Sequence, residues 1–313
     1  MGSRDGTDTM TIARKQQIDL AHTAYYHCMS RCVRQAYLCG HDRHSGLSFE
    51  HRRGWIVERL TRLVEVFAIE LLAYAVMSNH YHLVLRVNAE AARLWSDEEV
   101  AERWARLFRS PDTPPDAALL DTWRTRLSDI GWFMRCINEP IARAANREDG
   151  CVGRFWEGRY KLQALLDEAA VLRCMTYVDL NPIRAKMAST PRTSAYTSVQ
   201  ARLTGHARHL VPLRRAPGAA LSLTLREYLA LVEWSGRAVR TGKRGAIPGS
   251  APGLLQRIDV TPAHWAVEMR HYGRWYYRAV GSFHAMQRYA EHLGQRWLRG
   301  MPPPPPASAS ATA

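Results

Sequence analysis

Apolar residues recur at two different periods along this chain, and the two periods alternate from one segment to the next. A period of two is typical of half-buried strands, whereas apolar residues at i, i+3, i+4 and i+7 are typical of amphipathic helices. Strands are predicted over 23–33, 69–76, 80–87 and 155–162. Helices are predicted over 49–66, most of 90–148, 167–180, 221–234 and 263–298. This interleaving predicts an α+β sandwich with an antiparallel sheet and helices packed on one or both faces.

Two histidines flank one bulky residue inside the third predicted strand, in the order His80-Tyr81-His82. Successive side chains of a strand point to opposite faces, so both histidines are expected on one face and Tyr81 in the opposite layer. Two neutral imidazoles side by side form a half-site for a divalent metal that still needs further ligands. Taken alone, such a pair is more often two hydrogen-bonded sheet histidines than a metal site.

A tyrosine nearly a hundred residues later adds weight to the metal interpretation. The segment 167–180 is predicted to be a helix, with Asp167 as its N-cap and Pro182 as its stop. Tyr177 lies off the centre of the apolar stripe of this helix, so its hydroxyl is expected at the rim of a cleft. Asn181 follows one turn later, with an amide oxygen suited to a metal shell. The alternative for Tyr177 is an amphipathic tyrosine at the edge of the core.

Four blocks of sequence carry a resemblance to a known family. In chain order they read YHCMSRC, MSNHYHL, GRFWEGR and YVDLNP, over 26–32, 77–83, 153–159 and 177–182. In these blocks, which span about 20–190, the chain resembles the REP-associated tyrosine transposases of the IS200/IS605-like Y1 transposase superfamily.

The resemblance implies a ferredoxin-like HUH fold, where HUH stands for two histidines that flank one bulky hydrophobic residue (U). In this fold the tyrosine helix faces the strand that carries the histidines. It implies that His80 and His82 bind a metal, that Asn181 is a third polar ligand, and that Tyr177 is the nucleophile. The implied activity is that of a transposase and endonuclease, which cleaves and rejoins single-stranded hairpin DNA through a 5′-phosphotyrosine. The mixed ligand set favours Mg²⁺ or Mn²⁺ over structural zinc.

The charge of the chain is consistent with a nucleic-acid partner. There are 43 Lys+Arg against 29 Asp+Glu, a formal net charge of +14, and most of the excess lies beyond residue 200. Arginine pairs with phosphates, and aromatic faces stack on unpaired bases. The alternative is a helical subdomain with buried aromatics and a solvated basic face. Taken singly, a residue of this kind is more often a solvated surface charge or a core aromatic than a DNA contact. The candidate DNA contacts are Arg154, Arg159, Lys161, Arg184, Arg274, Trp275 and Arg278.

The predicted organisation is a flexible N-terminus (1–20), a catalytic domain (21–200), a basic and mostly helical C-terminal extension (201–300) and a disordered Pro/Ala/Ser tail (301–313). The catalytic domain contains an extra segment at about 93–130. This insertion is compatible with a lid, a contact to hairpin DNA or an oligomer contact.

The chain shows neither a signal peptide nor an apolar run long enough for a membrane span, which predicts a cytoplasmic protein. Its six scattered cysteines are expected to be reduced thiols. Cysteines and histidines near the N-terminus could together form a zinc site, but their spacing matches no standard zinc motif. Its members would be Cys28, Cys32, Cys39, His41 and His44.

Two rival functions stay open. A catalytically silent DNA-binding regulator would keep the fold and the basic surface without cleaving DNA. A metallohydrolase acting on a small molecule would need carboxylate ligands and a general base near the two histidines, which the sequence does not offer. The sequence also leaves monomer and homodimer open.

Overall fold

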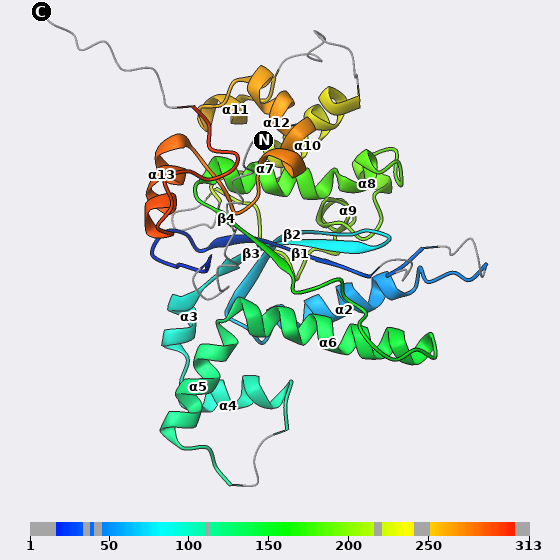
Figure 1. Ribbon diagram of the computed structural model, residues 1–313, viewed down its shortest axis with the longest axis vertical. Helices are drawn as coiled ribbons and strands as arrows, with labels where there is room; N and C mark the ends of the chain where they lie inside the picture. Colours follow the sequence, from blue (N-terminus) through cyan, green and yellow to red (C-terminus); the bar gives the residue numbers. More distant parts are fainter. Residues whose placement is uncertain are drawn as a thin grey trace, which may run out of the picture.

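The structure, a computed structural model, describes residues 17–33, 38–40, 46–109, 113–215, 221–240 and 251–303. At its centre lies a five-stranded sheet in the order β2-β3-β1-β4-β5 (Figure 1). Neighbouring strands are antiparallel, except that β4 and β5 run parallel. The strands are β1 (Tyr25–Arg31), β2 (Ile69–Val76), β3 (His80–Val87), β4 (Lys161–Leu165) and β5 (Ala279–Val280).

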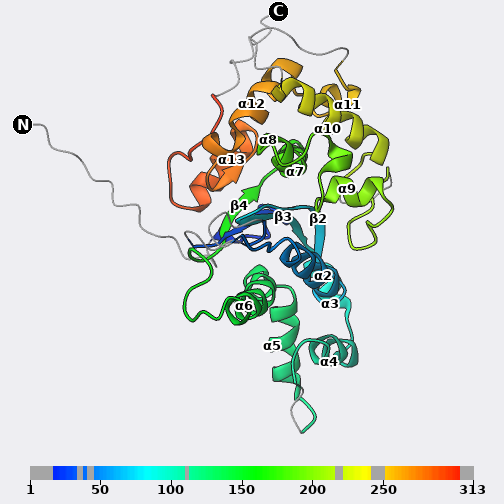
Figure 2. The ribbon, with the colours of Figure 1, turned by 90° about the vertical axis from the view of Figure 1, so that its right-hand side faces the viewer.

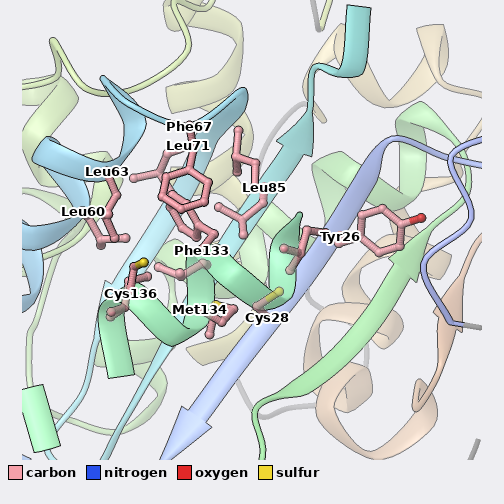
Figure 3. Close-up of a cluster of buried hydrophobic side chains, with 14 of the residues drawn as sticks. Tyr26, Cys28, Leu60, Leu63, Phe67, Leu71, Leu85, Phe133, Met134 and Cys136 are labelled. Carbon is pink, nitrogen blue, oxygen red and sulfur yellow. The ribbon is translucent and has the colours of Figure 1, made fainter. Parts of the chain in front are cut away.

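Helices cover both faces of this sheet (Figure 2). α2 (Arg52–Val64) and α6 (Ile130–Glu148) lie on one face, and α7 (Glu168–Asp179) lies on the other, followed by the short α8 (Asn181–Arg184). The apolar side chains between the sheet and the α2–α6 layer form the cluster drawn in Figure 3. In it, Phe67 and Phe133 meet edge to face, with ring centroids 5.3 Å apart. The chain is therefore a mixed α/β protein, as the pattern of the sequence predicts.

The alternation of β3 separates its side chains between the two layers. Tyr81 is fully buried on the α6 side, where its hydroxyl donates to Asn138 Oδ1 over 2.7 Å. His82 faces the opposite layer, where its ring lies 6.0 Å from that of Tyr177 on α7. The prediction that His80 and His82 share one face, with Tyr81 on the other, is confirmed.

The tyrosine helix begins and ends where the sequence predicts. Asp167 is its N-cap, and its carboxylate accepts from the amide of Ala170 over 2.8 Å. Cys174, Met175 and Val178 are completely buried against the sheet and the C-terminal helices. This buried stripe determines which face of α7 looks inward, and it leaves Tyr177 half-buried at its edge.

The predicted insertion folds as a helical lobe at the lower end of Figure 1. It contains α3 (Ala89–Leu94), α4 (Asp97–Ala105) and α5 (Ala117–Leu127). The indole rings of Trp104 and Trp123 stack with centroids 5.0 Å apart, which joins α4 to α5. The lobe lies on the α6 side of the sheet, away from the face that carries the histidines.

The C-terminal helices are α9 (Ser198–Leu203), α10 (Leu225–Arg240), α11 (Gly253–Arg257), α12 (Pro262–Trp275) and α13 (Phe283–His292), with a short 3-10 helix η1 (Pro191–Thr193) before α9. Of these helices, α10 and α12 pack directly on α7, and α9 and α11 contribute to the same apolar cluster, whereas α13 packs in the cluster on the other side of the sheet. Trp234 and Trp265 are buried in the same apolar cluster as α7. Asp179 of α7 also accepts from the hydroxyls of Ser198 and Tyr228, over 2.6 and 2.5 Å. The extension is therefore continuous with the core of the preceding residues.

Three predicted elements differ most from the structure. The helix predicted over 221–234 is observed over Leu225–Arg240. β4 begins at Lys161 instead of residue 155, because the preceding residues pack as a loop, in which the Trp156 indole donates to the carbonyl of Asn138 over 2.9 Å. The predicted helix 263–298 is instead two helices separated by β5. α12 ends at Trp275, and the backbone of Tyr276 is extended (φ −96°, ψ 136°). The sequence does not predict β5, because a strand of two residues is too short to show a periodic pattern.

Several predictions concern residues at or beyond the edge of the described part. Most of 1–20 and 301–313 lies outside it, and so do His41 and His44 of the zinc arrangement. The described part includes all six cysteines, and none of them is in a disulfide. No helix within the described residues has both the length and the apolar character that crossing a membrane requires.

Candidate active site

A cleft of about 850 Å³ opens on the α7 side of the sheet. Its walls come from β1, β3 and β4, from α7 and α12, and from the segment after α13. It brings together residues that are far apart in the sequence, because α12 packs on the tyrosine helix and α13 lies beside β4 (Figure 2). Of the residues predicted from the sequence, it is lined by His80, His82, Tyr177, Arg159, Lys161 and Arg278.

Both histidines of the pair use Nδ1 within the protein. His80 Nδ1 donates to Asn79 Oδ1 over 2.6 Å, and His82 Nδ1 lies 2.9 Å from His27 Nε2. His82 is 3% exposed, and its buried Nε2 has no hydrogen-bond partner within the part of the chain that the structure describes. A buried nitrogen without a partner is unfavourable unless a ligand uses its lone pair. The two rings have centroids 4.9 Å apart, and because each uses Nδ1 within the protein, Nε2 is the nitrogen that is left for a ligand.

The histidines of the cleft are held in their neutral form. Burial lowers the pKa of His27 to about 4 and, together with the nearby Arg31 and His27, lowers that of His80 to about 4. Burial and the neighbouring histidines place the pKa of His82 well below its usual range. The lone pairs that a metal requires are therefore available at neutral pH.

These pKa values predict a loss of stability in mild acid. Below pH 6.5 the unfolded chain binds protons on these histidines, whereas the folded chain resists protonation down to about pH 4. The free energy of unfolding should fall from pH 7 to pH 5 by about 1–2 kcal/mol for each of His27 and His80. Urea denaturation in EDTA measures this. The double variant His27→Gln/His80→Gln should show a shallower decrease, and an equally steep decrease would contradict the burial of neutral imidazoles.

Tyr177 is held between aromatic rings and one cation. Its ring stacks on Tyr272 of α12 with centroids 4.5 Å apart, and the Arg184 guanidinium lies 5.2 Å from the ring centroid. Burial raises the pKa of Tyr177, and the positive charge of Arg184 opposes that rise. Arg184 is itself held by the main-chain carbonyls of Met269 and Arg270 on α12. Its observed contacts are therefore with the tyrosine and α12.

Asn181 lies beside Tyr177 and is not among the residues that line the cleft. It is 9% exposed, and its carboxamide favours the ionised form of the Tyr177 phenol. Its Nδ2 meets no acceptor at full hydrogen-bond geometry within the described residues. Its predicted role as a third metal ligand stays a prediction.

The remaining candidate DNA contacts lie outside the cleft. Arg154 is exposed in the loop before β4. Arg274 and Trp275 are at the end of α12, where the Trp275 ring stacks on His271 with centroids 5.0 Å apart. The cleft contains two further cations from distant segments, Arg31 at the end of β1 and Arg299 after α13.

Sequence reasoning missed three polar residues of the cleft. His27, Gln163 and Tyr272 come from β1, β4 and α12, and they are hydrogen-bonded to one another behind His82. The sequence offers weak signals for two of them: His27 lies in the block YHCMSRC on the same face of β1 as Tyr25 and Met29, and Tyr272 lies among the aromatics of the basic C-terminal extension. The contact of His27 with His82 depends on the pairing of β1 with β3, which no local pattern encodes.

The fold and the site define an α+β protein in which a histidine pair and a tyrosine face each other across a basic cleft. No protein-family profile and no curated protein matches the chain. Among solved structures, the chain is similar to a REP-associated tyrosine transposase bound to a REP hairpin. The match has a TM-score of 0.37 and 10% identity, and it covers 74% of this chain and 91% of that one. Similarity at this level assigns neither a family nor an activity to the chain.

Proposed function

We propose that this protein cleaves and rejoins single-stranded DNA, with Tyr177 as the nucleophile and a divalent cation, Mg²⁺ or Mn²⁺, at His80 and His82. The observation that carries the proposal is the juxtaposition of His82, whose buried Nε2 lacks a partner in the described chain, with Tyr177, the two ring centroids being 6.0 Å apart. A phenol beside a metal half-site in a basic cleft has the parts needed to attack a phosphodiester.

In the proposed reaction the Tyr177 oxygen attacks a backbone phosphorus, and the bond from phosphorus to the 3′ oxygen breaks. The phenol loses its proton and the leaving 3′ oxygen gains one, so the products are a 5′-phosphotyrosine and a 3′-hydroxyl. The phosphotyrosine ester conserves the energy of the broken bond, and rejoining therefore needs no ATP. A cation at the histidines would polarise a phosphate oxygen. Arg184 favours the phenolate that attacks.

The cleft suits an unpaired strand. Its cations, Arg31, Arg159, Lys161, Arg278 and Arg299, can follow a phosphate backbone. Tyr277 and Trp297, which also line the cleft, are each 61% exposed and offer faces on which bases can stack. The proposed substrate is therefore single-stranded DNA, with a hairpin beside the cleavage point as the resemblance implies.

The experiment that tests the proposal is a nicking assay. Hairpin-bearing oligonucleotides from the DNA that flanks the gene, and scrambled oligonucleotides, are incubated with the protein in Mg²⁺, in Mn²⁺ or in EDTA. The expected result is a discrete product with a 3′-hydroxyl that requires the metal. Hairpin binding without any product would favour the DNA-binding regulator.

Gly273 provides a prediction about the position of the nucleophile. A Cβ atom at this position of α12 would lie 2.9 Å from the Tyr177 hydroxyl oxygen, so Gly273→Ala must displace the phenol. Alanine normally stabilises a helix by about 0.5–1 kcal/mol relative to glycine, so folding should survive. A nucleophile displaced by a fraction of an ångström should cleave about 10- to 100-fold more slowly. Single-turnover nicking rates measure the effect.

Gly54→Ala is the matched control for that variant. Gly54 also lies within a helix, α2, and a Cβ there would meet no atom within 4 Å. It should therefore gain helix stability and leave the cleavage rate unchanged. Equal rates for Gly273→Ala and the wild type would show that the hydroxyl position seen here is not the one used in cleavage.

A further inference from the structure

We propose that His27 is a positioning residue that fixes the tautomer of His82, and that α12 of the C-terminal extension supports it through Tyr272. The proposal rests on the proposed function only in taking His82 as a metal ligand. It gives the extension a defined role, because Tyr272, which lies 190 positions beyond His82, helps to determine which nitrogen of that histidine is free.

The direction of each hydrogen bond follows from the chemistry of its acceptor. The carboxamide oxygen of Gln163 accepts from the Tyr272 hydroxyl over 3.0 Å and from His27 Nδ1 over 3.2 Å. A carboxamide oxygen can only accept, so the proton of neutral His27 is on Nδ1. Nε2 of His27 then carries a lone pair.

The lone pair on His27 Nε2 determines the tautomer of His82. His27 Nε2 lies 2.9 Å from His82 Nδ1, so His82 must donate from Nδ1. The lone pair of His82 is therefore on Nε2, the buried atom that lacks a partner in the described chain. The opposite tautomer would set two lone pairs against each other and leave a buried N–H at Nε2 without an acceptor. The relay thus presents a metal-binding nitrogen before any metal arrives.

The members of this relay are buried at the base of the cleft. Gln163 is 7% exposed and Tyr272 is 1% exposed, so burial favours hydrogen bonds within the protein over hydrogen bonds to water. The two rings at the end of the relay stack with centroids 5.1 Å apart and an interplanar angle of 19°. Gln163 joins Tyr272 to His27, and His27 joins Gln163 to His82, so a change at Tyr272 or Gln163 should reach His82.

Helix α12 therefore supports both halves of the site. Tyr272 begins the relay to His82 and also stacks on Tyr177, and the adjacent Gly273 leaves room for the Tyr177 hydroxyl, which a Cβ there would meet at 2.9 Å. The same helix holds Arg184 through two main-chain carbonyls. On these contacts the extension belongs to the catalytic unit and is not a separate DNA-binding module.

The tautomers of His27 and His82 can be tested in metal-free protein. In ¹⁵N-histidine-labelled full-length protein, long-range ¹H–¹⁵N spectra should show both rings protonated at Nδ1, with assignments from His27→Gln and His82→Gln. In Gln163→Leu, the His27 signal should shift toward the Nε2-protonated form, and the His82 signal should shift with it. A wild-type His82 protonated at Nε2, or a Gln163→Leu spectrum in which His82 is unchanged, would overturn the proposal.

Mn²⁺ titration calorimetry provides the second readout. His27→Phe keeps an aromatic ring, which is slightly larger, and loses the acceptor, so it should weaken Mn²⁺ binding about 10- to 100-fold. His27→Gln offers an amide oxygen to His82 Nδ1 and should restore most of that affinity. His209→Phe, at a half-buried histidine beside Tyr74, is the control and should bind as the wild type does. Equal Mn²⁺ affinities for His27→Phe and the wild type would refute the positioning role.

The two proposals fail separately. A protein that shows the expected tautomers and the expected Mn²⁺ affinities, yet cleaves no DNA, would refute the proposed function and support the relay. A protein that cleaves DNA through Tyr177 with the opposite His82 tautomer would refute the relay alone.

Discussion

Tyr177→Phe should lower the rate of single-strand cleavage by at least about 10⁴-fold, because it removes the atom that forms the new bond to phosphorus. The substitution keeps the stacking with Tyr272 and the edge contact with His82, which both belong to the ring. DNA binding should therefore change by less than about threefold. Single-turnover nicking of a hairpin oligonucleotide and filter binding of the same oligonucleotide separate the two effects.

Tyr196→Phe is the matched control. Tyr196 lies outside the cleft, in the loop before α9, so the loss of its hydroxyl should leave cleavage unchanged. Cleavage at the wild-type rate in Tyr177→Phe would remove this tyrosine from the role of nucleophile. Loss of both cleavage and binding would mean that the phenol is needed to hold DNA.

Replacing both histidines of the proposed metal site should have the second-largest effect. His80→Gln/His82→Gln removes both Nε2 lone pairs while it keeps most of the side-chain volume. Stabilisation of the transition state by a Lewis acid amounts to several kcal/mol, so cleavage should fall about 10³-fold. Mn²⁺ titration should show the loss of one binding event in the variant.

His264→Gln is the control for the double variant. His264 lies on α12 with its ring about half exposed, and it pairs with Glu268 away from the cleft lining. It should keep both the cleavage rate and the Mn²⁺ stoichiometry. If the double variant bound Mn²⁺ as the wild type does, the metal would not be at these histidines.

The parts of the fold that could be predicted are those that local patterns encode. The alternation around His80-Tyr81-His82 predicts the bounds of β3 and the face of each side chain, and both are confirmed. The capping aspartate Asp167 and the stop at Pro182 place α7 within a residue of its observed ends. These features depend on neighbours within one or two turns, so the sequence alone is sufficient.

The parts that could not be predicted depend on pairing between distant segments. β5 is two residues long and exists only because it pairs with β4. Gln163 reaches His27 through the pairing of β4 with β1, and Tyr272 reaches Gln163 only after α12 packs on α7. The basic composition of the C-terminal extension indicates a DNA contact, but it does not predict that Tyr272 and Gly273 would lie against the tyrosine.

Covalent trapping tests the central claim most directly. Labelled hairpin oligonucleotides from the flanking DNA are incubated with wild-type protein and Tyr177→Phe in Mn²⁺, and an SDS-resistant adduct is sought and mapped by peptide mass spectrometry. The account predicts an adduct on Tyr177 in the wild type, absent in EDTA and absent in Tyr177→Phe. An adduct on another residue, or hairpin binding without an adduct across several flanking hairpins, would contradict it, and the latter result would favour a DNA-binding regulator.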